Sequence, residues 1–408
     1  MSAIDNEDQA GKDRQRTFIH ELFDSVFHLP IQNITTLPRC NNNFVHFVEF
    51  STHMEADTTL SDKPGTSAIS TGTSKAVFRV GNPAAMFNHA VKVENTVAMM
   101  HLTRQALSAF SIVPKVYAWS SVGEPSGTGW ILEEYMPGIN QMARILKAVQ
   151  DFNLPPKAAG FGGLAFDDAG EVINGPYVVE PYNGPYPDMI SMYKGMMQAQ
   201  LLDADRSPVV KGYRDSGLRD RLNAFAERGL EDTLTKILPQ HVRPNLIIGD
   251  VVIANLLFDP NTLQVTGLVD FDCSHTGHPL HEYFFSSFSV KYYIVSAEPE
   301  VASAIFDQYP SPLPQSEPIS GPEARDDDPP QWELMELFER ELAKAGAARP
   351  SNISGAEEIT KVYEVMAQIC PFHFVMDKWT ERQSEERLQS CKEEQMKILD
   401  KALSGWGF

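Results

Sequence analysis

The sequence predicts an α+β protein of two parts, a small strand-rich N-terminal part and a larger, mainly helical C-terminal part. Runs of aromatic and β-branched residues dominate the first third, the Pro137-Gly138 pair follows them, and long segments beyond that pair look helical. We expect the N-terminal part to span residues 1–137 and the C-terminal part residues 138–408, with a flexible linker at about 308–330. A chain of 408 residues is long enough for two separate hydrophobic cores.

Local patterns place each element of the N-terminal part. A helix is predicted at 16–29, where apolar side chains recur at near-helical spacing, and another at 90–110, a stretch free of Pro and Gly. The polar segment 51–74 is predicted to be a loop. The predicted strands, rich in β-branched and aromatic residues, are 43–50, 76–80, 115–119 and 130–134.

The C-terminal part is predicted to be mostly helical. Residues 154–188 are rich in Pro, Gly and Tyr and are expected to be irregular or short-stranded, and residues 245–272 alternate apolar strands with polar turns. The predicted helical segments are 141–150, 189–238 with a break near Ser207-Pro208, and 331–403.

Composition and charge exclude several classes of protein. The formal net charge is −20, with 34 basic and 54 acidic residues, which argues against a non-specific grip on nucleic acid or an anionic membrane. The four cysteines form no CxxC pair, so no zinc site is expected. We find neither a signal peptide nor an apolar run of about 20 residues, the length that spans a membrane. A cytoplasmic protein is the expectation.

The most informative segment is Leu246–Asp272, in which two apolar strands flank the turn Asp259-Pro260-Asn261. The first strand leads into Asp250, Asn255 follows shortly after it, and the second strand leads to Asp270. Phosphoryl transfer needs a carboxylate that orients the attacking hydroxyl or accepts its proton, and an oxygen-rich pair that holds magnesium. Each residue alone is more often a cap or a turn residue, but together at one end of a hairpin they supply both functions.

This segment resembles the HGDxxxxN and (I/V)DW/F(E/D) motifs of the aminoglycoside phosphotransferase (choline kinase-like) family, and looks closest to its large fungal branch. The resemblance covers roughly residues 40–295 and implies a bilobal protein-kinase-like fold with ATP and Mg²⁺ as cofactors. It implies that Asp250 is the catalytic base and that Asn255 and Asp270 are metal ligands. The family usually has His before Gly-Asp, whereas this chain has Ile248, which leaves altered or lost phosphotransfer as an alternative.

Upstream residues match the same family in order and spacing. Arg79 falls where its third strand carries the ATP-phosphate-binding Lys or Arg, and Glu94 matches the helix Glu that pairs with this cation. A cation held by a carboxylate is rigid and can clamp phosphate oxygens. Lys75, on the same side of the strand, is the reserve cation. The alternative is an ordinary surface ion pair.

The segment GWILEEYMPG resembles the hinge of the family. The resemblance implies that backbone groups around Glu134, Tyr135 and Met136 bind adenine. The strand at Asn42, Asn43 and Phe44 would cover the phosphates, although it lacks a glycine-rich pattern. No GxxxxGK[ST] loop is present, which excludes an ordinary P-loop enzyme.

The segment that follows Asp270 bears on the acceptor. HTGHPLHEYFFSSF, residues 275–288, matches the family's continuation after the metal Asp, and His278, Pro279 and Glu282 are expected to be structural. Only a few residues separate Asp270 from the next predicted helix, so the long activation segment that serves protein kinases as a substrate platform is missing. This spacing favours a small-molecule acceptor, bound by the helices of the C-terminal part.

The sequence therefore predicts a phosphotransferase that moves the γ-phosphate of ATP to a hydroxyl or amine of a small metabolite. Two alternatives remain open: a kinase fold repurposed in secondary-metabolite biosynthesis, where phosphorylation activates elimination or condensation or ATP is not used, and a pseudokinase that only binds a partner. The acceptor, the choice between ATP and GTP, and the oligomeric state are not encoded in any motif we recognise.

Overall fold

The computed structural model describes residues 3–36, 43–83, 87–110, 112–121, 129–135, 142–178, 183–239, 241–258, 265–286, 294–295, 297–314 and 330–408. Several positions named in the sequence predictions lie outside these residues. They are Asn42, Met136, the boundary pair Pro137-Gly138, the turn Asp259-Pro260-Asn261 and most of the linker predicted at 308–330.

The chain forms two compact units, and each unit is assembled from several segments. The first unit comprises Met1–Ala158, Gly163–Val179 and Ala254–His275, and the second comprises Ala159–Gly162, Glu180–Ile253 and Thr276–Phe408. Two segments from beyond residue 137 thus belong to the first unit. This division differs from the single boundary expected there, because the chain returns to the first unit after leaving it.

The first unit is organised around a five-stranded antiparallel sheet with the order β1-β2-β3-β5-β4. Its strands are β1 (Ile31–Thr36), β2 (Asn43–Phe50), β3 (Lys75–Gly81), β4 (Val116–Ser120) and β5 (Trp130–Glu134). The four strands predicted from the sequence are confirmed. The edge strand β1 was not predicted, because its sequence IQNITT is largely polar and buries only Ile34.

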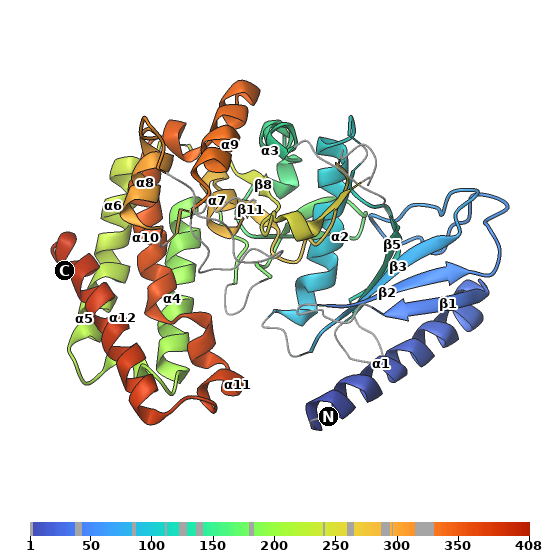
Figure 1. Cartoon of the computed structure of the whole chain (residues 1–408), viewed down its shortest axis with the longest axis horizontal. Helices are drawn as coiled ribbons and strands as arrows, with labels where there is room; N and C mark the ends of the chain where they lie inside the picture. Colours follow the sequence, from blue (N-terminus) through green and yellow to red (C-terminus); the bar gives the residue numbers. More distant parts are fainter. Residues whose placement is uncertain are drawn as a thin grey trace. The chain divides into compact units, whose positions relative to one another are not determined.

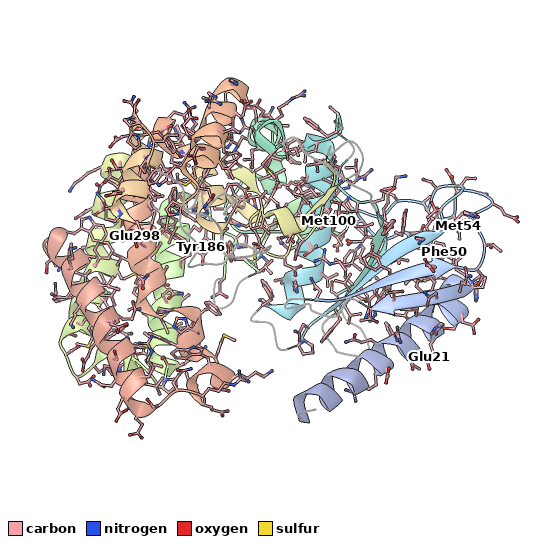
Figure 2. All side chains as sticks on the ribbon, in the orientation of Figure 1. Glu21, Phe50, Met54, Met100, Tyr186 and Glu298 are labelled. Atoms are coloured by element: carbon pink, nitrogen blue, oxygen red, sulfur yellow. The ribbon has the colours of Figure 1, made fainter. Side chains whose placement is uncertain are left out.

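One face of this sheet is covered by helix α1 (Ala3–Leu22) and the π-helical turn after it, Phe23–Phe27. Figure 1 shows α1 running along the sheet beside β1. The helix and sheet share a buried core that includes Ile19, Phe23, Val48, Phe50, Met54, Phe78 and Trp130, of which Phe50 and Met54 are labelled in Figure 2. Because strand side chains alternate between faces, Arg79, which lies between Phe78 and Val80, points to the opposite side of the sheet from α1.

Among the described residues, the first unit also contains α-helices and paired antiparallel strands outside the main sheet. They are α2 (His89–Ala106), α3 (Met142–Asp151), the pair β6 (Gly163–Phe166) and β7 (Val172–Gly175), and the pair β9 (Leu256–Phe258) and β10 (Val265–Leu268). Helix α2 is tied to β6 through Asn95, whose side-chain oxygen accepts the Leu164 N–H at 2.5 Å. The helices predicted at 90–110 and 141–150 are confirmed.

The second unit is mainly helical, as predicted. Its elements are α4 (Met189–Arg206), α5 (Leu218–Ala224), α6 (Leu230–Ile237), β8 (Asn245–Ile247), α7 (Glu282–Phe285), α8 (Pro299–Phe306), α9 (Trp332–Ala345), α10 (Ala356–Ile369), α11 (Asp377–Thr380) and α12 (Glu385–Gly405), with β11 (His275–Gly277) where the chain enters it. Figure 1 shows α4, α10 and α12 running alongside one another. The break expected near Ser207-Pro208 is confirmed, since α4 ends at Arg206.

These two units confirm the predicted α+β class, with a strand-rich and a mainly helical part. Within the ranges that the structure describes, no helix combines the length and the hydrophobicity needed to cross a bilayer.

Candidate functional site

A cluster of buried charges lies in the first unit, on the face of the sheet opposite α1, and Arg79 is at its centre. The Arg79 Nη2 atom lies 3.1 Å from Asp270 Oδ1 and 3.2 Å from Asp272 Oδ1, and its Nη1 atom lies 3.8 Å from Glu133 Oε1. Arg79 is only 6% exposed. The guanidinium thus fixes three carboxylates that come from two separate stretches of the chain.

The register of the sheet explains the contact between Arg79 and Glu133. In the pairing of β3 with β5, Arg79 is opposite Ile131 and Val77 is opposite Glu133. Arg79 and Glu133 are therefore diagonal neighbours on the same face, a separation that long side chains can bridge.

Asp272 has a second cationic partner, Lys92 of helix α2. The Lys92 Nζ atom lies 3.1 Å from Asp272 Oδ2 and donates a hydrogen bond of 3.0 Å to Asn43 Oδ1. The Asn43 amide in turn donates to Asp272 Oδ2 at 2.6 Å. Both oxygens of Asp272 are therefore occupied, one by Arg79 and the other by Lys92 and Asn43.

Burial and neighbouring charges shift the pKa values of the cluster in opposite directions. Burial works against the charged guanidinium, but Glu133, Asp272 and Asp270 outweigh it and raise the pKa of Arg79. Burial raises the pKa of Glu133 to about 7, although Arg79 opposes this shift. Burial and the negative charge of Asp272 raise the pKa of Asp270. Burial lowers the pKa of Lys92, although the negative charge of Asp272 opposes this shift. The cations and carboxylates are therefore held in a water-poor environment.

Asp270 is the member of the cluster that is exposed enough to contact a ligand. Its side chain is 29% exposed. Its Oδ1 atom takes the contacts with Arg79 and with the Asp272 N–H, whereas its Oδ2 atom makes no hydrogen bond to any residue that the structure describes. The backbone of Asp270 has a φ of 67°, and the residue before it, Val269, donates its N–H to the Asn255 carbonyl at 3.0 Å.

These features fit a magnesium ion. The Asp270 oxygen that makes no described hydrogen bond and the amide oxygen of Asn255, whose backbone bonds to Val269, are the hard oxygen ligands that Mg²⁺ prefers. No group of three or more His, Cys, Asp or Glu side chains able to hold a metal occurs among the described residues. Asp270 and Asn255 are the residues here whose side chains could hold such an ion.

Asp250 lies in the second unit, in a loop that is held by helix α7. The Glu282 carboxylate accepts the N–H of Ile248 at 2.8 Å and that of Gly249 at 3.0 Å. Ser286 Oγ accepts the Val251 N–H at 2.8 Å and donates to Glu282 Oε1 at 2.7 Å. The loop around Asp250 is thus fastened on both sides of the catalytic candidate.

This arrangement gives the loop an anchor that does not need a histidine before Gly-Asp. Ile248 is buried, and its backbone N–H, rather than its side chain, makes the contact with Glu282. Asp250 donates its own N–H to the Phe285 carbonyl at 3.0 Å and has a φ of 58°, a left-handed conformation that a non-glycine residue adopts only when its surroundings hold it there. Burial raises the pKa of Glu282, and the hydrogen bonds that it accepts oppose the shift.

The predicted ion pair between Arg79 and Glu94 does not form. Glu94 instead accepts the Phe166 N–H at 2.8 Å, and the described ion pairs of Arg79 go to Glu133, Asp270 and Asp272. The phase of helix α2 explains the difference. At about 100° per residue, Glu94 lies about 200° around the helix from Lys92, the residue that faces the cluster.

Lys75, Glu134 and Tyr135, the other residues predicted to contact ATP, have partners outside the charge cluster. Lys75 forms an ion pair of 2.6 Å with Glu49 near the surface. The N–H of Glu134 donates to the Lys115 carbonyl at 2.8 Å, and its carboxylate accepts the Lys115 N–H at 3.0 Å. That N–H is therefore not available to adenine. Tyr135 is 44% exposed, with its ring edge against Phe47.

His278 and Glu282, expected to be structural, have structural partners in the second unit. His278 Nδ1 accepts the Leu280 N–H at 3.2 Å, and Glu282 anchors the Asp250 loop.

Comparison with known proteins identifies the family of the chain. The sequence model of the phosphotransferase enzyme family matches residues 65–318, which is more than half of the chain. The chain belongs to the phosphotransferase enzyme family. This confirms the resemblance drawn from the Asp250, Asn255 and Asp270 motif, and it confirms the prediction of a small-molecule kinase at the level of the enzyme class, a phosphotransferase.

Several solved structures of such enzymes are similar to the chain at low sequence identity. Aminoglycoside phosphotransferase APH(4)-Ia is 11% identical, with 96% of this chain and 98% of that chain covered and a TM-score of 0.46. ADP-bound aminoglycoside phosphotransferase APH(2'')-Ib is 11% identical, with 94% and 98% covered and a TM-score of 0.46. A protein named as a fructosamine-3-kinase, from Haemophilus somnus 129PT, is 12% identical, with 93% and 96% covered and a TM-score of 0.45. No curated protein sequence matches the chain.

Reasoning from the sequence missed three members of the charge cluster, two that pair with Arg79 and one that pairs with Asp272. They are Glu133, Asp272 and Lys92. One signal was available, because Lys92 is the single basic residue in the otherwise mostly apolar stretch AVKVENTVAMM. The choice of Glu133 over its neighbour Glu134 depends on strand register, which the sequence does not display.

Proposed function

We propose that this phosphotransferase transfers the γ-phosphate of ATP to a hydroxyl or amine of a small-molecule metabolite. The observation that carries the proposal is the state of Asp270: Arg79 holds its Oδ1 atom, and its Oδ2 atom is open. A carboxylate fixed on one side and open on the other is what a magnesium–nucleotide complex needs.

Asp270 and Asn255 are the proposed magnesium ligands. Bound magnesium would neutralise the charge that develops on the phosphate oxygens during transfer. The chain's own contribution is to keep the Asp270 carboxylate in one orientation, since a ligand that must reorient before each turnover slows the reaction. The ion pair with Arg79 and the left-handed backbone of Asp270 both restrict that carboxylate.

We assign Arg79 to positioning Asp270, in place of the direct phosphate contact expected from the sequence. Its side chain is buried, and each of its described ion pairs is to a carboxylate. For adenine, we propose the backbone around Tyr135 and Met136 together with the Glu134 carbonyl, because the Glu134 N–H is bonded to Lys115.

Asp250 is the proposed residue that orients the acceptor hydroxyl or amine and accepts its proton. Its loop is held by two backbone hydrogen bonds to Glu282 and one to Ser286. The replacement of a histidine by Ile248 was the one sequence feature that favoured a binding-only protein. The Glu282 anchor supports the catalytic proposal, because it gives the loop a fixed conformation without that histidine.

The experiment that tests the proposal is calorimetric titration with ATP in the presence and absence of Mg²⁺, with GTP run in parallel. Wild type is compared with Asp270→Ala and with the control Asp151→Ala, an exposed aspartate of α3 whose ion-pair partner is Lys147. We expect magnesium-dependent binding in wild type and in the control, and its loss in Asp270→Ala.

Normal magnesium-dependent binding by folded Asp270→Ala would show that the site is elsewhere. Once binding is established, incubation with hydroxylated and amine metabolites, followed by mass spectrometry, identifies the acceptor through the mass gain of a phosphoryl group. A dehydrated or condensed product in place of a phosphate ester would favour the alternative of a biosynthetic enzyme.

A further inference from the structure

The ammonium group of Lys92 occupies a small site that has the features of a cation-binding site. Its Nζ atom lies 3.1 Å from Asp272 Oδ2, 3.0 Å from Asn43 Oδ1 and 4.5 Å from the centre of the Phe87 ring. A carboxylate oxygen, an amide oxygen and an aromatic face each attract a positive charge. The Lys92 side chain is 2% exposed, so this cation is held inside the protein.

The cation site of Lys92 lies beside the proposed metal ligand Asp270. Asp270 and Asp272 stand two positions apart, and both contact the same nitrogen of Arg79. Two neighbouring carboxylates are a common basis for sites that hold a pair of divalent ions. Of these two carboxylates, Asp270 has an oxygen without a hydrogen bond to the described residues, whereas Arg79 contacts Asp272 Oδ1, and Lys92 and Asn43 contact Asp272 Oδ2.

We propose that the Lys92 ammonium takes the place of a second divalent cation at Asp272, so that the chain binds its nucleotide with a single metal ion, on Asp270. This inference rests on the proposed function, since it concerns the metal content of the same nucleotide site. It makes Asp272 and Lys92 positioning residues rather than catalytic ones.

A tethered ammonium is well suited to this role. It is part of the chain, so it is present whatever the metal concentration, and it neutralises Asp272 in surroundings where an unpaired carboxylate is costly. If the side chain of Lys92 is removed, two oxygen atoms remain that have lost their cation, Asp272 Oδ2 and Asn43 Oδ1. Oxygen ligands of this kind favour Mg²⁺ or Mn²⁺.

The test counts metal ions. Mn²⁺ bound to the full chain in the presence of a saturating, non-hydrolysable ATP analogue is measured by equilibrium dialysis and by electron paramagnetic resonance. We expect a single Mn²⁺ per wild-type chain. The Lys92→Ala variant, which leaves both oxygens and space for an ion, should bind a second Mn²⁺, and millimolar methylammonium should displace that second ion.

Two matched variants separate this effect from simple damage. Lys92→Met removes the charge but fills the space, so it should bind no second ion. The double variant Lys92→Ala/Asp272→Asn keeps the space but loses the carboxylate, and should return to a single ion. Thermal unfolding of each variant shows whether it is folded.

The inference is overturned if wild type binds two Mn²⁺ ions, or if folded Lys92→Ala binds the same number as wild type. If Lys92→Ala does not fold, the Asp272→Asn variant tests the inference instead. A single Mn²⁺ ion bound to Asp272→Asn supports the inference. Loss of that ion would show that Asp272 is itself a metal ligand and would overturn the inference. Absence of any nucleotide-dependent Mn²⁺ binding by wild type is a different result, because it rejects the proposed function and the inference together.

Discussion

Arg79 and Asp270 lie 191 positions apart in the sequence and 3.1 Å apart in the structure, with the guanidinium of one against a single oxygen of the other. The contact joins the central sheet to the segment that carries the proposed metal ligand. The second oxygen of Asp270 makes no hydrogen bond to any residue that the structure describes. The orientation of the proposed metal ligand therefore depends on a strand far away in the chain.

Replacing Arg79 should damage both stability and nucleotide binding. Arg79→Met leaves Glu133, Asp270 and Asp272 without their shared cation, and removing one partner of a buried ion pair costs about 3–5 kcal/mol. Urea unfolding measures the stability, and calorimetry of the folded fraction should show weakened magnesium-dependent ATP binding. Glu94→Gln is the control: it keeps an oxygen for the Phe166 N–H and should change stability by less than about 1 kcal/mol. Similar losses in both variants would restore Glu94 as the partner of Arg79.

The carboxyl of Glu133 should make the protein less stable as the pH rises. Its pKa is raised from the ordinary 4.5 to about 7, chiefly by burial, so the folded state binds the proton more tightly than the unfolded state. Its contribution to stability is therefore complete below about pH 4.5 and is lost as the pH rises through about 7, a change on the order of 3 kcal/mol.

The Glu133 prediction is checked by urea unfolding at a series of pH values from 5 to 8. Glu133→Gln, which has no proton to lose in this range, should show a smaller decline across it than wild type. Parallel curves for the two proteins would show that Glu133 is not the group responsible.

Glu282 should matter for turnover more than for nucleotide binding. Glu282→Ala leaves the N–H groups of Ile248 and Gly249 without their acceptor, and each buried unsatisfied group costs about 1–3 kcal/mol. The Asp250 loop should lose its fixed conformation, so kcat should fall while the Kd for MgATP stays near that of wild type. Ser286→Ala removes one acceptor, for Val251, and should have a smaller effect of the same kind. An unchanged kcat in folded Glu282→Ala would separate this anchor from catalysis.

Asp250 should be required for transfer but not for binding. Asp250→Asn keeps the size of the side chain and removes its capacity to accept a proton, so kcat should fall by about a hundredfold or more once an acceptor is known. Calorimetry should give nearly the wild-type affinity for MgATP. Equal loss of binding and transfer would contradict the proposed role as the base.

The sequence was a good guide wherever a feature is local in the chain. The strand at 43–50, the helix break after Arg206 and the spacing of Asp250, Asn255 and Asp270 all depend on neighbouring residues, and each could be read directly. The predicted Arg79–Glu94 pair was wrong because it depended on helix phase. Only the docked position of α2 determines which of its polar side chains faces the sheet.

The other missed features depend on how elements pair. Strand β1 is an edge strand whose residues are mostly polar, so its pairing with β2 fixes it rather than any propensity of IQNITT. Glu133 and Glu134 are adjacent and chemically identical, yet the β3–β5 register places one against Arg79, while the other bonds to Lys115. The structural role of Glu282 was predicted from its motif, but its partners, the backbone N–H groups of Ile248 and Gly249, became known only from the fold, because they lie more than thirty positions earlier in the chain.

The interrupted path of the chain through the first unit has a consequence for its synthesis. The sheet strands up to Glu134 leave the ribosome well before Asp270 and Asp272, because domains are made from the N-terminus onwards. Until the segment Ala254–His275 has been translated, Arg79 and Lys92 lack most of the carboxylates that neutralise them in the finished protein. The ion pairs of Arg79 and Lys92 with Asp270 and Asp272 therefore form only after the second half of the chain has been translated, and the first unit is completed at that point.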